Sequence, residues 1–90
     1  MHCIEKECPV CGYGSIGFFR CSDGKTLALV CDECSCVWLS ADDVSPENAD
    51  APQPPDFRLS GIDIGLAGPL AGWALLEEIT NSGLGSYISK

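Results

Sequence analysis

Short apolar-rich segments separated by turn residues in the first half of the chain predict short antiparallel strands. Ser15–Cys21 (SIGFFRC) and Thr26–Val30 (TLALV) have strand composition. The polar tetrapeptide SDGK between them is typical of a hairpin turn, since its glycine can adopt a positive φ. Val37–Ser40 (VWLS) predicts a third short strand. We therefore expect three short antiparallel strands in this half.

The pattern changes to a helical spacing in the last third of the chain. The apolar residues that recur at this spacing are Leu70, Trp73, Leu76 and Ile79. Pro69 can open a helix, because the first turn does not need its missing N–H, and Gly83 can end it in the left-handed conformation. Residues 61–68 fit either a loop or a short strand. We expect one helix here, with Trp73 docking it onto the sheet.

Composition divides the chain into three segments. All the cysteines lie in residues 1–44, whereas residues 45–56 form an acidic connector with four prolines, expected to be extended. Residues 57–90 form the helical segment. The fold class predicted from these segments is a small α+β, metal-bound domain, with the C-terminal helix packed on the sheet as part of one domain.

Seven cysteines in a 90-residue chain indicate that a metal ion or disulfides stabilise the fold, because a chain this short builds only a thin core. The odd number excludes complete disulfide pairing within one chain. Residues 1–10 contain Glu5, Lys6 and Glu7 and lack the apolar stretch of a secretion signal. We therefore expect a cytoplasmic protein, whose reducing surroundings favour metal binding over disulfides.

The spacing of four cysteines predicts the metal site. Cys8-x-x-Cys11 and Cys31-x-x-Cys34 are separated by 19 residues that include the predicted hairpin. Two residues between thiols allow a tight turn to aim both sulfurs at one ion, and Gly12 supplies the conformation that such a turn needs. Two turns of this kind give the four thiolates of a closed structural zinc site.

These residues carry a resemblance to a known family. The sequence from Glu7 to Ser40, with Cys-Pro-Val-Cys-Gly, a hairpin, Cys-Asp-Glu-Cys and then Trp38, resembles a zinc ribbon with rubredoxin-type knuckles. The resemblance implies that the cofactor is Zn²⁺ and that Trp38 covers the second knuckle. Ser35 stands where a glycine often follows the last cysteine, which favours zinc over the iron of a rubredoxin.

The remaining cysteines and the single histidine suggest no catalytic centre. Cys36 could replace Cys34 as a ligand, but packing near the site is the better interpretation. Cys3 and Cys21 fit ordinary buried thiols, and a second metal site formed by these three with His2 has irregular spacing. Four thiolates leave no position for an activated water, and we expect His2 to lie at a frayed terminus. We therefore expect that the protein is not an enzyme.

The charge of the chain indicates the kind of partner. Thirteen acidic residues against five Lys and Arg give a formal net charge of −8. An acidic surface repels phosphate and anionic membranes and attracts basic proteins. The longest charge-free apolar stretch, Ile64–Leu76, has 13 residues and is too short to cross a bilayer. We expect no direct contact with nucleic acid or membrane.

We therefore predict a structural-zinc module that binds and blocks a basic protein. The candidate partner-binding residues are Asp42, Asp43, Glu47, Asp50, Trp73, Glu77, Glu78 and Tyr87. In general plan the chain also resembles small bacterial immunity-type proteins that neutralise toxins: a ribbon, an acidic connector, the Trp73 and Glu-Glu-Ile helix, and a Gly-Ser-Tyr-Ile ending. The alternatives are a transcription-associated or nucleic-acid-associated zinc ribbon and a rubredoxin-like iron electron carrier.

Overall fold

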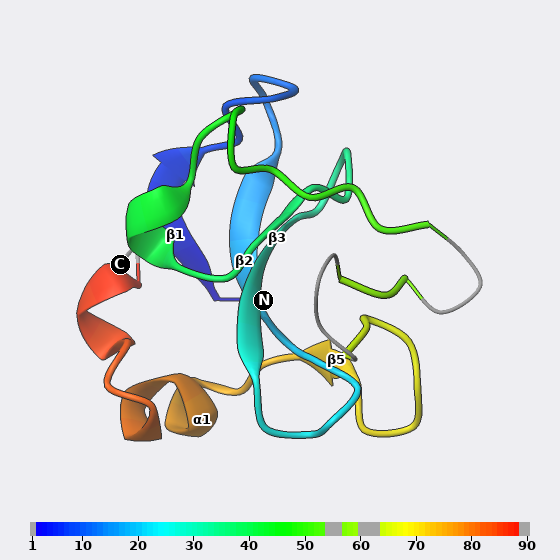
Figure 1. Ribbon diagram of the computed structural model, residues 1–90. Coiled ribbons are helices and arrows are strands. Elements are labelled where there is room, and N and C mark those ends of the chain that lie inside the picture. The colour runs from blue at the N-terminus through cyan, green and yellow to red at the C-terminus, as the bar shows by residue number, and fades with distance from the viewer. Residues whose placement is uncertain (1, 54–56, 60–63, 89–90) are drawn as a thin grey trace.

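A small antiparallel sheet forms the centre of the molecule (Figure 1). The computed structural model describes residues 2–53, 57–59 and 64–88. Its strands are β1 (Cys3–Glu7), β2 (Ser15–Arg20), β3 (Leu27–Cys31), β4 (Val37–Trp38) and β5 (Gly72–Trp73). Two 3₁₀ turns, η1 (Ala41–Asp43) and η2 (Gly85–Tyr87), and one α-helix, α1 (Leu76–Asn81), complete the described elements. The chain is thus a small α+β domain.

The predicted hairpin is the central pair of the sheet. β2 pairs with β3 from Ile16 opposite Cys31 to Arg20 opposite Leu27. Gly24 has a φ of 74° in the turn between them. The carboxylate of Asp23 closes this turn by accepting hydrogen bonds from the N–H groups of Lys25 at 3.0 Å and Thr26 at 2.9 Å. All three predicted strands are therefore confirmed, with slightly different ends.

The other edge of β2 is shared by two strands that the sequence pattern did not predict. β1 pairs with the first half of β2, with Cys3 opposite Gly17, and β5 pairs with the second half, with Trp73 opposite Phe19. The β1 sequence CIEKE has one buried residue, so it lacks the alternation that indicates a strand. The expected fraying of His2 is also wrong, because its carbonyl accepts a hydrogen bond from the Phe18 N–H at 2.9 Å.

The expectation of a helix that begins at Pro69 is wrong. The helix begins at Leu76, and Gly72–Trp73 instead forms β5, so that Leu70 and Trp73 do not lie on a helix face. A glycine inside a helix costs about 1 kcal/mol relative to alanine. The open edge of β2 offers Trp73 a backbone partner and an edge-to-face contact with Phe19, with ring centroids 5.1 Å apart. The predicted end is confirmed, since Gly83 follows the helix with a φ of 78°.

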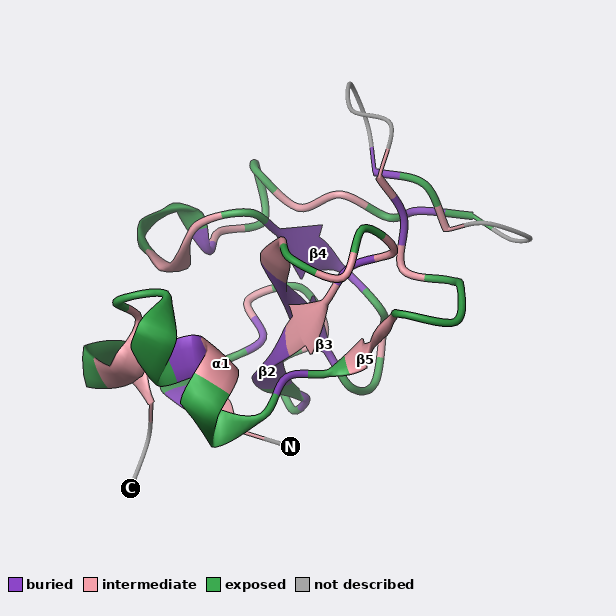
Figure 2. Ribbon diagram, turned by 90° about the horizontal axis from the view of Figure 1, so that it is seen from below, coloured by how far each residue is buried: buried purple, intermediate pink, exposed green. Residues whose placement is uncertain are grey.

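The two faces of the sheet carry two groups of buried side chains, because successive strand residues point to opposite sides. The larger group consists of Ile4, Cys8, Ile16, Phe18, Leu29, Cys31, Cys36, Trp38, Val44, Ala74 and Ile79. The smaller group, on the opposite face, consists of Cys21, Ala28, Val30, Val37 and Leu59. Figure 2 shows buried segments along the strands and one buried part of α1, where Ile79 has no exposed surface. Ile79 of α1 is therefore part of the larger core group.

Residues that follow β4 lie against the sheet. The Trp38 indole N–H donates to the Ser45 carbonyl at 2.8 Å, and Val37 and Asp50 exchange two backbone hydrogen bonds of 2.8 and 2.9 Å. Lys6 donates to the Val44 carbonyl at 2.9 Å. The first part of the proline-rich segment is therefore held along β4 by its backbone. Residues 54–56, the rest of that segment, lie outside the described residues.

A charged pair joins the helix to the sheet. The Arg20 guanidinium on β2 donates through Nη1 to the Glu78 carboxylate on α1. The Nε of Arg20 donates to the Leu70 carbonyl at 2.6 Å. The same Glu78 carboxylate accepts a hydrogen bond from the Leu75 N–H at 3.0 Å and so caps the first turn of α1.

Among the described residues, the structure has no helix with the length and apolar character that a membrane span requires.

The first prediction separates the two adjacent glutamates of α1. Glu78→Ala removes the cap of α1 and the partner of Arg20. The side chains of Arg20 and Glu78 are each 27% exposed, so solvent screens the ion pair, and we expect a loss of about 1 kcal/mol of unfolding free energy. Glu77→Ala changes an exposed residue and should cost less than about 0.5 kcal/mol. Thermal unfolding of the metal-loaded variants measures the difference. Equal melting temperatures for the two variants would contradict this account.

Candidate metal centre

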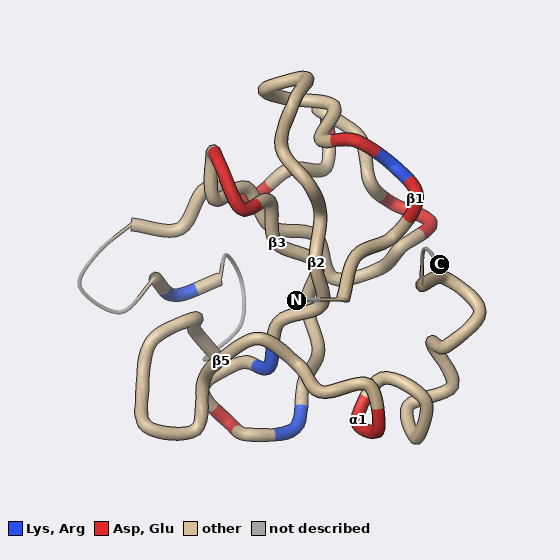
Figure 3. Tube along the Cα trace, turned by 180° about the vertical axis from the view of Figure 1, so that it is seen from behind, with Lys and Arg blue, Asp and Glu red and all other residues tan. Residues whose placement is uncertain are grey.

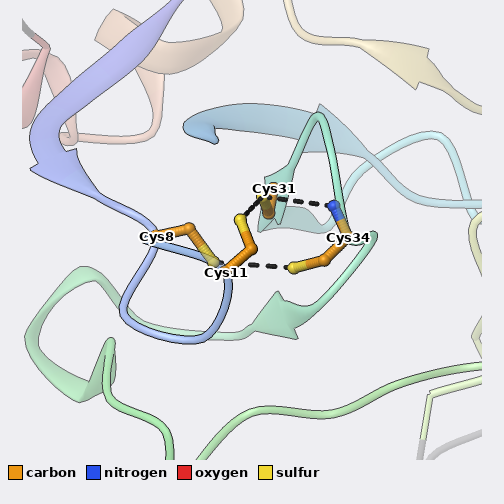
Figure 4. A group of neighbouring side chains, drawn as sticks. All are labelled: Cys8, Cys11, Cys31 and Cys34. Atoms are coloured by element: carbon orange, nitrogen blue, oxygen red, sulfur yellow. Dashed lines mark hydrogen bonds between the residues drawn. The ribbon is translucent and has the colours of Figure 1, made fainter. Parts of the chain in front are cut away.

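Two tight turns bring four cysteine sulfurs together at one end of the central hairpin (Figure 4). Cys8 and Cys11 lie in the connection between β1 and β2, whereas Cys31 ends β3 and Cys34 lies in the connection to β4. The four Sγ atoms all lie within 4.8 Å of one another. This is the cluster that the two Cys-x-x-Cys motifs predicted, and it could hold a metal ion.

The spacing of the sulfurs fits a shared ion. The Cys8 and Cys34 Sγ atoms are 3.6 Å apart, and so are those of Cys11 and Cys31. A tetrahedron of thiolates around an ion at about 2.3 Å has edges of roughly 3.8 Å. A disulfide needs about 2.05 Å. All four thiols are free in the structure, so the distances fit metal ligands and do not fit disulfides.

The two turns have matching backbone hydrogen bonds. The Gly12 N–H donates to the Cys8 carbonyl at 2.9 Å, and the Ser35 N–H donates to the Cys31 carbonyl at 3.2 Å. Gly12 has a φ of 79° and Ser35 a φ of 63°. Ser35 therefore adopts the left-handed conformation that a glycine adopts in the first turn, at a cost of about 1–2 kcal/mol. The serine departs from the expected glycine in sequence but not in backbone geometry.

Backbone N–H groups point at two of the sulfurs. Gly14 donates to the Cys11 Sγ at 3.4 Å, and Glu33 and Cys34 donate to the Cys31 Sγ at 3.4 and 3.5 Å. Such bonds stabilise thiolate charge without using a side chain. The turns therefore supply both the ligands and part of their stabilisation.

The pKa values of the thiols follow from burial and these hydrogen bonds. Burial raises the pKa of Cys31 to about 12 and the pKa of Cys34 to about 11. Backbone hydrogen bonds, first that of the Tyr13 N–H, lower the pKa of Cys11 to about 7. A metal ion that binds thiolates here must therefore displace protons from Cys31 and Cys34.

Gly14 is a site residue that the sequence pattern did not single out. A Cβ built on this buried glycine would lie 2.4 Å from the Cys31 Sγ and 3.2 Å from the Cys11 Sγ. No side chain fits there without displacing a sulfur. The signal in the sequence was weak, since a glycine three residues after Cys11 is also common in ordinary turns.

Asp32 fixes the second turn to the start of β2. Its Oδ1 accepts the Ser15 N–H at 2.9 Å, and its own N–H donates to the Ser15 carbonyl at 3.0 Å. Ser15 also pairs with Glu7, which directly precedes Cys8. One residue therefore ties the two cysteine turns to a common strand.

Cys36 and Cys21 are not members of the four-sulfur cluster. Cys36 is buried in the larger core group, and its carbonyl accepts the Cys31 N–H at 3.0 Å, so it packs beside the site as expected. Cys21 is buried in the smaller group, where desolvation raises its pKa to about 11. Among the described residues, the four predicted cysteines are the one group of three or more His, Cys, Asp and Glu that could hold a metal.

The candidate partner-binding acids do not lie on a single element. Figure 3 shows acidic positions on α1, on β1 and in several loops. Asp42, Asp43 and Glu47 are exposed in η1 and the residues after it, and Glu77 is exposed on α1. Glu78 is engaged with Arg20. Asp50 is half-buried and lies next to β4 through its backbone.

The two aromatic candidates are partly exposed and come from different elements. Trp73 is 39% exposed in β5, where its ring contacts Phe19, and Tyr87 is 39% exposed in η2. Trp73 thus contacts the sheet from a strand rather than from the expected helix. Trp38 is 2% exposed in the core group that contains Cys8, Cys31 and Cys36.

Fold and site together define a small α+β domain with an antiparallel hairpin and a cysteine tetrad, an arrangement that fits a zinc ribbon. The chain is similar to "Uncharacterized protein L48" of Acanthamoeba polyphaga mimivirus, with 26% identity over 86 residues that cover 90% of this chain and 72% of the viral protein. No family model matches the chain, and no solved structure matches it significantly.

The second prediction tests the space beside the sulfurs. Gly14→Ala should lower metal affinity by more than about 100-fold, because its methyl group would force the Cys31 Sγ out of the tetrahedron. Competition with a chromophoric chelator measures this affinity.

Gly12→Ala is the matched control. A methyl group at Gly12 would meet no atom of the surrounding structure within 4 Å, so this substitution adds only backbone strain of about 1–2 kcal/mol. It should weaken metal binding by no more than about 30-fold, since each step of about 1.4 kcal/mol is a factor of ten. Unchanged affinity in Gly14→Ala would show that the sulfurs do not bind the ion as described.

Proposed function

We propose that this chain is a structural-zinc module that acts by binding another protein. The observation that carries this proposal is the completeness of the ligand set: all four corners of the tetrahedron are cysteine sulfurs. Catalytic zinc sites keep one position open for water or substrate, whereas structural sites close it. A closed site stabilises the fold, so the function lies on the surface of the protein.

Zinc suits this site for two reasons. Soft thiolate ligands in a tetrahedron select zinc or iron, and zinc needs no redox partner. Zinc binding also adds on the order of 10 kcal/mol or more in small domains. This is comparable with the whole stability of a domain of this size, about 0.05–0.15 kcal/mol per residue.

A rubredoxin-like electron carrier is the second candidate. The observation that favours it is Ser35, which adopts the left-handed conformation of the usual glycine. Three N–H groups also donate to the sulfurs, and such bonds tune the potential of iron–sulfur sites. Colour separates the two metals directly, because ferric iron on four thiolates absorbs visible light and zinc does not.

The surface supports a basic protein as the partner. The exposed acids Asp42, Asp43 and Glu47 lie close together in the chain around η1. The chain as a whole has a formal net charge of −8. This excess of negative charge would steer association with a basic protein and repel nucleic acid.

In its narrower form, the proposal is that this protein inhibits the basic protein that it binds. A protein that attacks nucleic acid has a basic cleft, and an acidic inhibitor of the immunity type neutralises it by occupying that cleft. A small domain of −8 charge, held together by its metal, suits this role because it needs no chemistry of its own.

The third prediction tests the acidic face around η1. The double variant Asp42→Lys and Glu47→Lys, used as bait in lysate of the source cells, should lose a basic protein that the parent retains. With that protein purified, association with the parent should slow about tenfold between roughly 50 and 300 mM salt, since screening shortens to several Å.

The control carries the same charge change elsewhere. Glu5→Lys and Glu7→Lys replace two exposed acids of β1 and should retain the partner. Equal association rates for both double variants and the parent would contradict the assignment of this face.

A further inference from the structure

An aromatic hollow of about 240 Å³ lies beside the second cysteine turn. Three rings line it, those of Phe19, Phe57 and Trp73, together with the aliphatic side chains of Val30 and Leu66. Val30 belongs to the smaller core group, and Phe19 and Leu66 pack against that group, so the hollow lies on the smaller-core face of the sheet. Its volume is below the 300–1,000 Å³ of typical drug-sized sites. It therefore suits one small chemical group.

Defined contacts hold the Phe19 and Trp73 rings and the backbone of Phe57. The Phe19 and Trp73 rings are 81° apart in orientation and form a corner. Phe57 adopts a φ of 50°, which is unusual for a bulky residue. Its N–H donates to the Gln53 carbonyl at 3.0 Å, and the Phe57 carbonyl accepts a hydrogen bond from the Leu66 N–H at 3.1 Å. A strained backbone that is fixed in this way is common at ligand-binding positions.

One acidic residue is among those that line the hollow. Asp32 lies in its lining and is positioned by the Ser15 N–H at 2.9 Å. The described lining contains no Lys or Arg. Aromatic faces carry negative potential and attract cations. Three rings and a carboxylate therefore favour a cation over a neutral or anionic group.

We propose that this hollow binds the methylated ammonium group of a lysine side chain on the partner protein. A plain ammonium loses strong hydration on entering an apolar pocket and needs several acceptors, of which the lining offers few. Methylation removes the donors and leaves the charge, which suits aromatic rings. The inference rests on the proposed function only in taking the partner to be a protein.

The test uses the zinc-loaded protein and three peptides of one basic sequence. Their central residue is trimethyl-lysine, unmodified lysine or a neutral tert-butyl analogue of the same shape. We expect the trimethyl-lysine peptide to bind at least about tenfold tighter than either of the others. Titrations followed by ¹H–¹⁵N NMR should shift the Trp73 indole signal and leave that of the buried Trp38 unchanged.

Two variants and one control make the result specific. Trp73→Leu and Phe57→Leu each keep an apolar side chain and should weaken binding several-fold, with the backbone spectrum and zinc content reporting whether each variant is folded. Leu75→Ala removes a 63% exposed side chain that does not line the hollow and should bind normally.

Three outcomes would overturn the inference. They are equal binding of the charged and neutral peptides, binding of tetramethylammonium alone as tightly as the peptide, and no binding at all. A negative result here, combined with loss of a basic partner in the η1 charge-reversal variant, would reject the hollow and retain the proposed function.

Discussion

The gathering of four cysteine sulfurs into one cluster is the constraint on which the rest of this structure depends. The described core consists of two small groups of side chains, and the larger contains Cys8, Cys31 and Cys36 among its members. The Sγ atoms of Cys8 and Cys34, and those of Cys11 and Cys31, are 3.6 Å apart, so thiolates at these positions would repel one another unless a cation lay between them. A metal ion bound to this cluster would therefore link the connection between β1 and β2 to the end of β3.

β2 connects the cysteine turns to β1, β5 and α1. Ser15 joins the two cysteine turns through Glu7 and Asp32, and β2 then offers its outer edge first to β1 and next to β5. Arg20, at the end of β2, holds α1 through Glu78. Segments far from the cysteines in sequence are thus positioned by a strand that begins beside the cysteine cluster. The same strand presents Phe19 to Trp73 in the aromatic hollow.

Local patterns were sufficient to predict the hairpin, the cysteine tetrad and the end of the helix, because each depends on residues close in sequence or on a fixed ligand spacing. They were insufficient for β1 and β5. CIEKE has no alternation, and Gly72–Trp73 is a strand only because the edge of β2 lies beside it. Gly14 was missed for a similar reason, since the contact that forbids its side chain comes from Cys31, seventeen positions away. Long-range pairing decided each of these positions.

The most direct test of a closed four-thiolate zinc site is X-ray absorption spectroscopy of the purified protein at the metal edge. The account predicts a zinc edge and a first shell of four sulfur atoms at about 2.3 Å, with no nitrogen or oxygen neighbour. Cys34→Ser should replace one sulfur by a lighter atom at about 2.0–2.2 Å. A parent spectrum with fewer than four sulfurs, a light atom in the first shell or an iron edge would contradict the central claim.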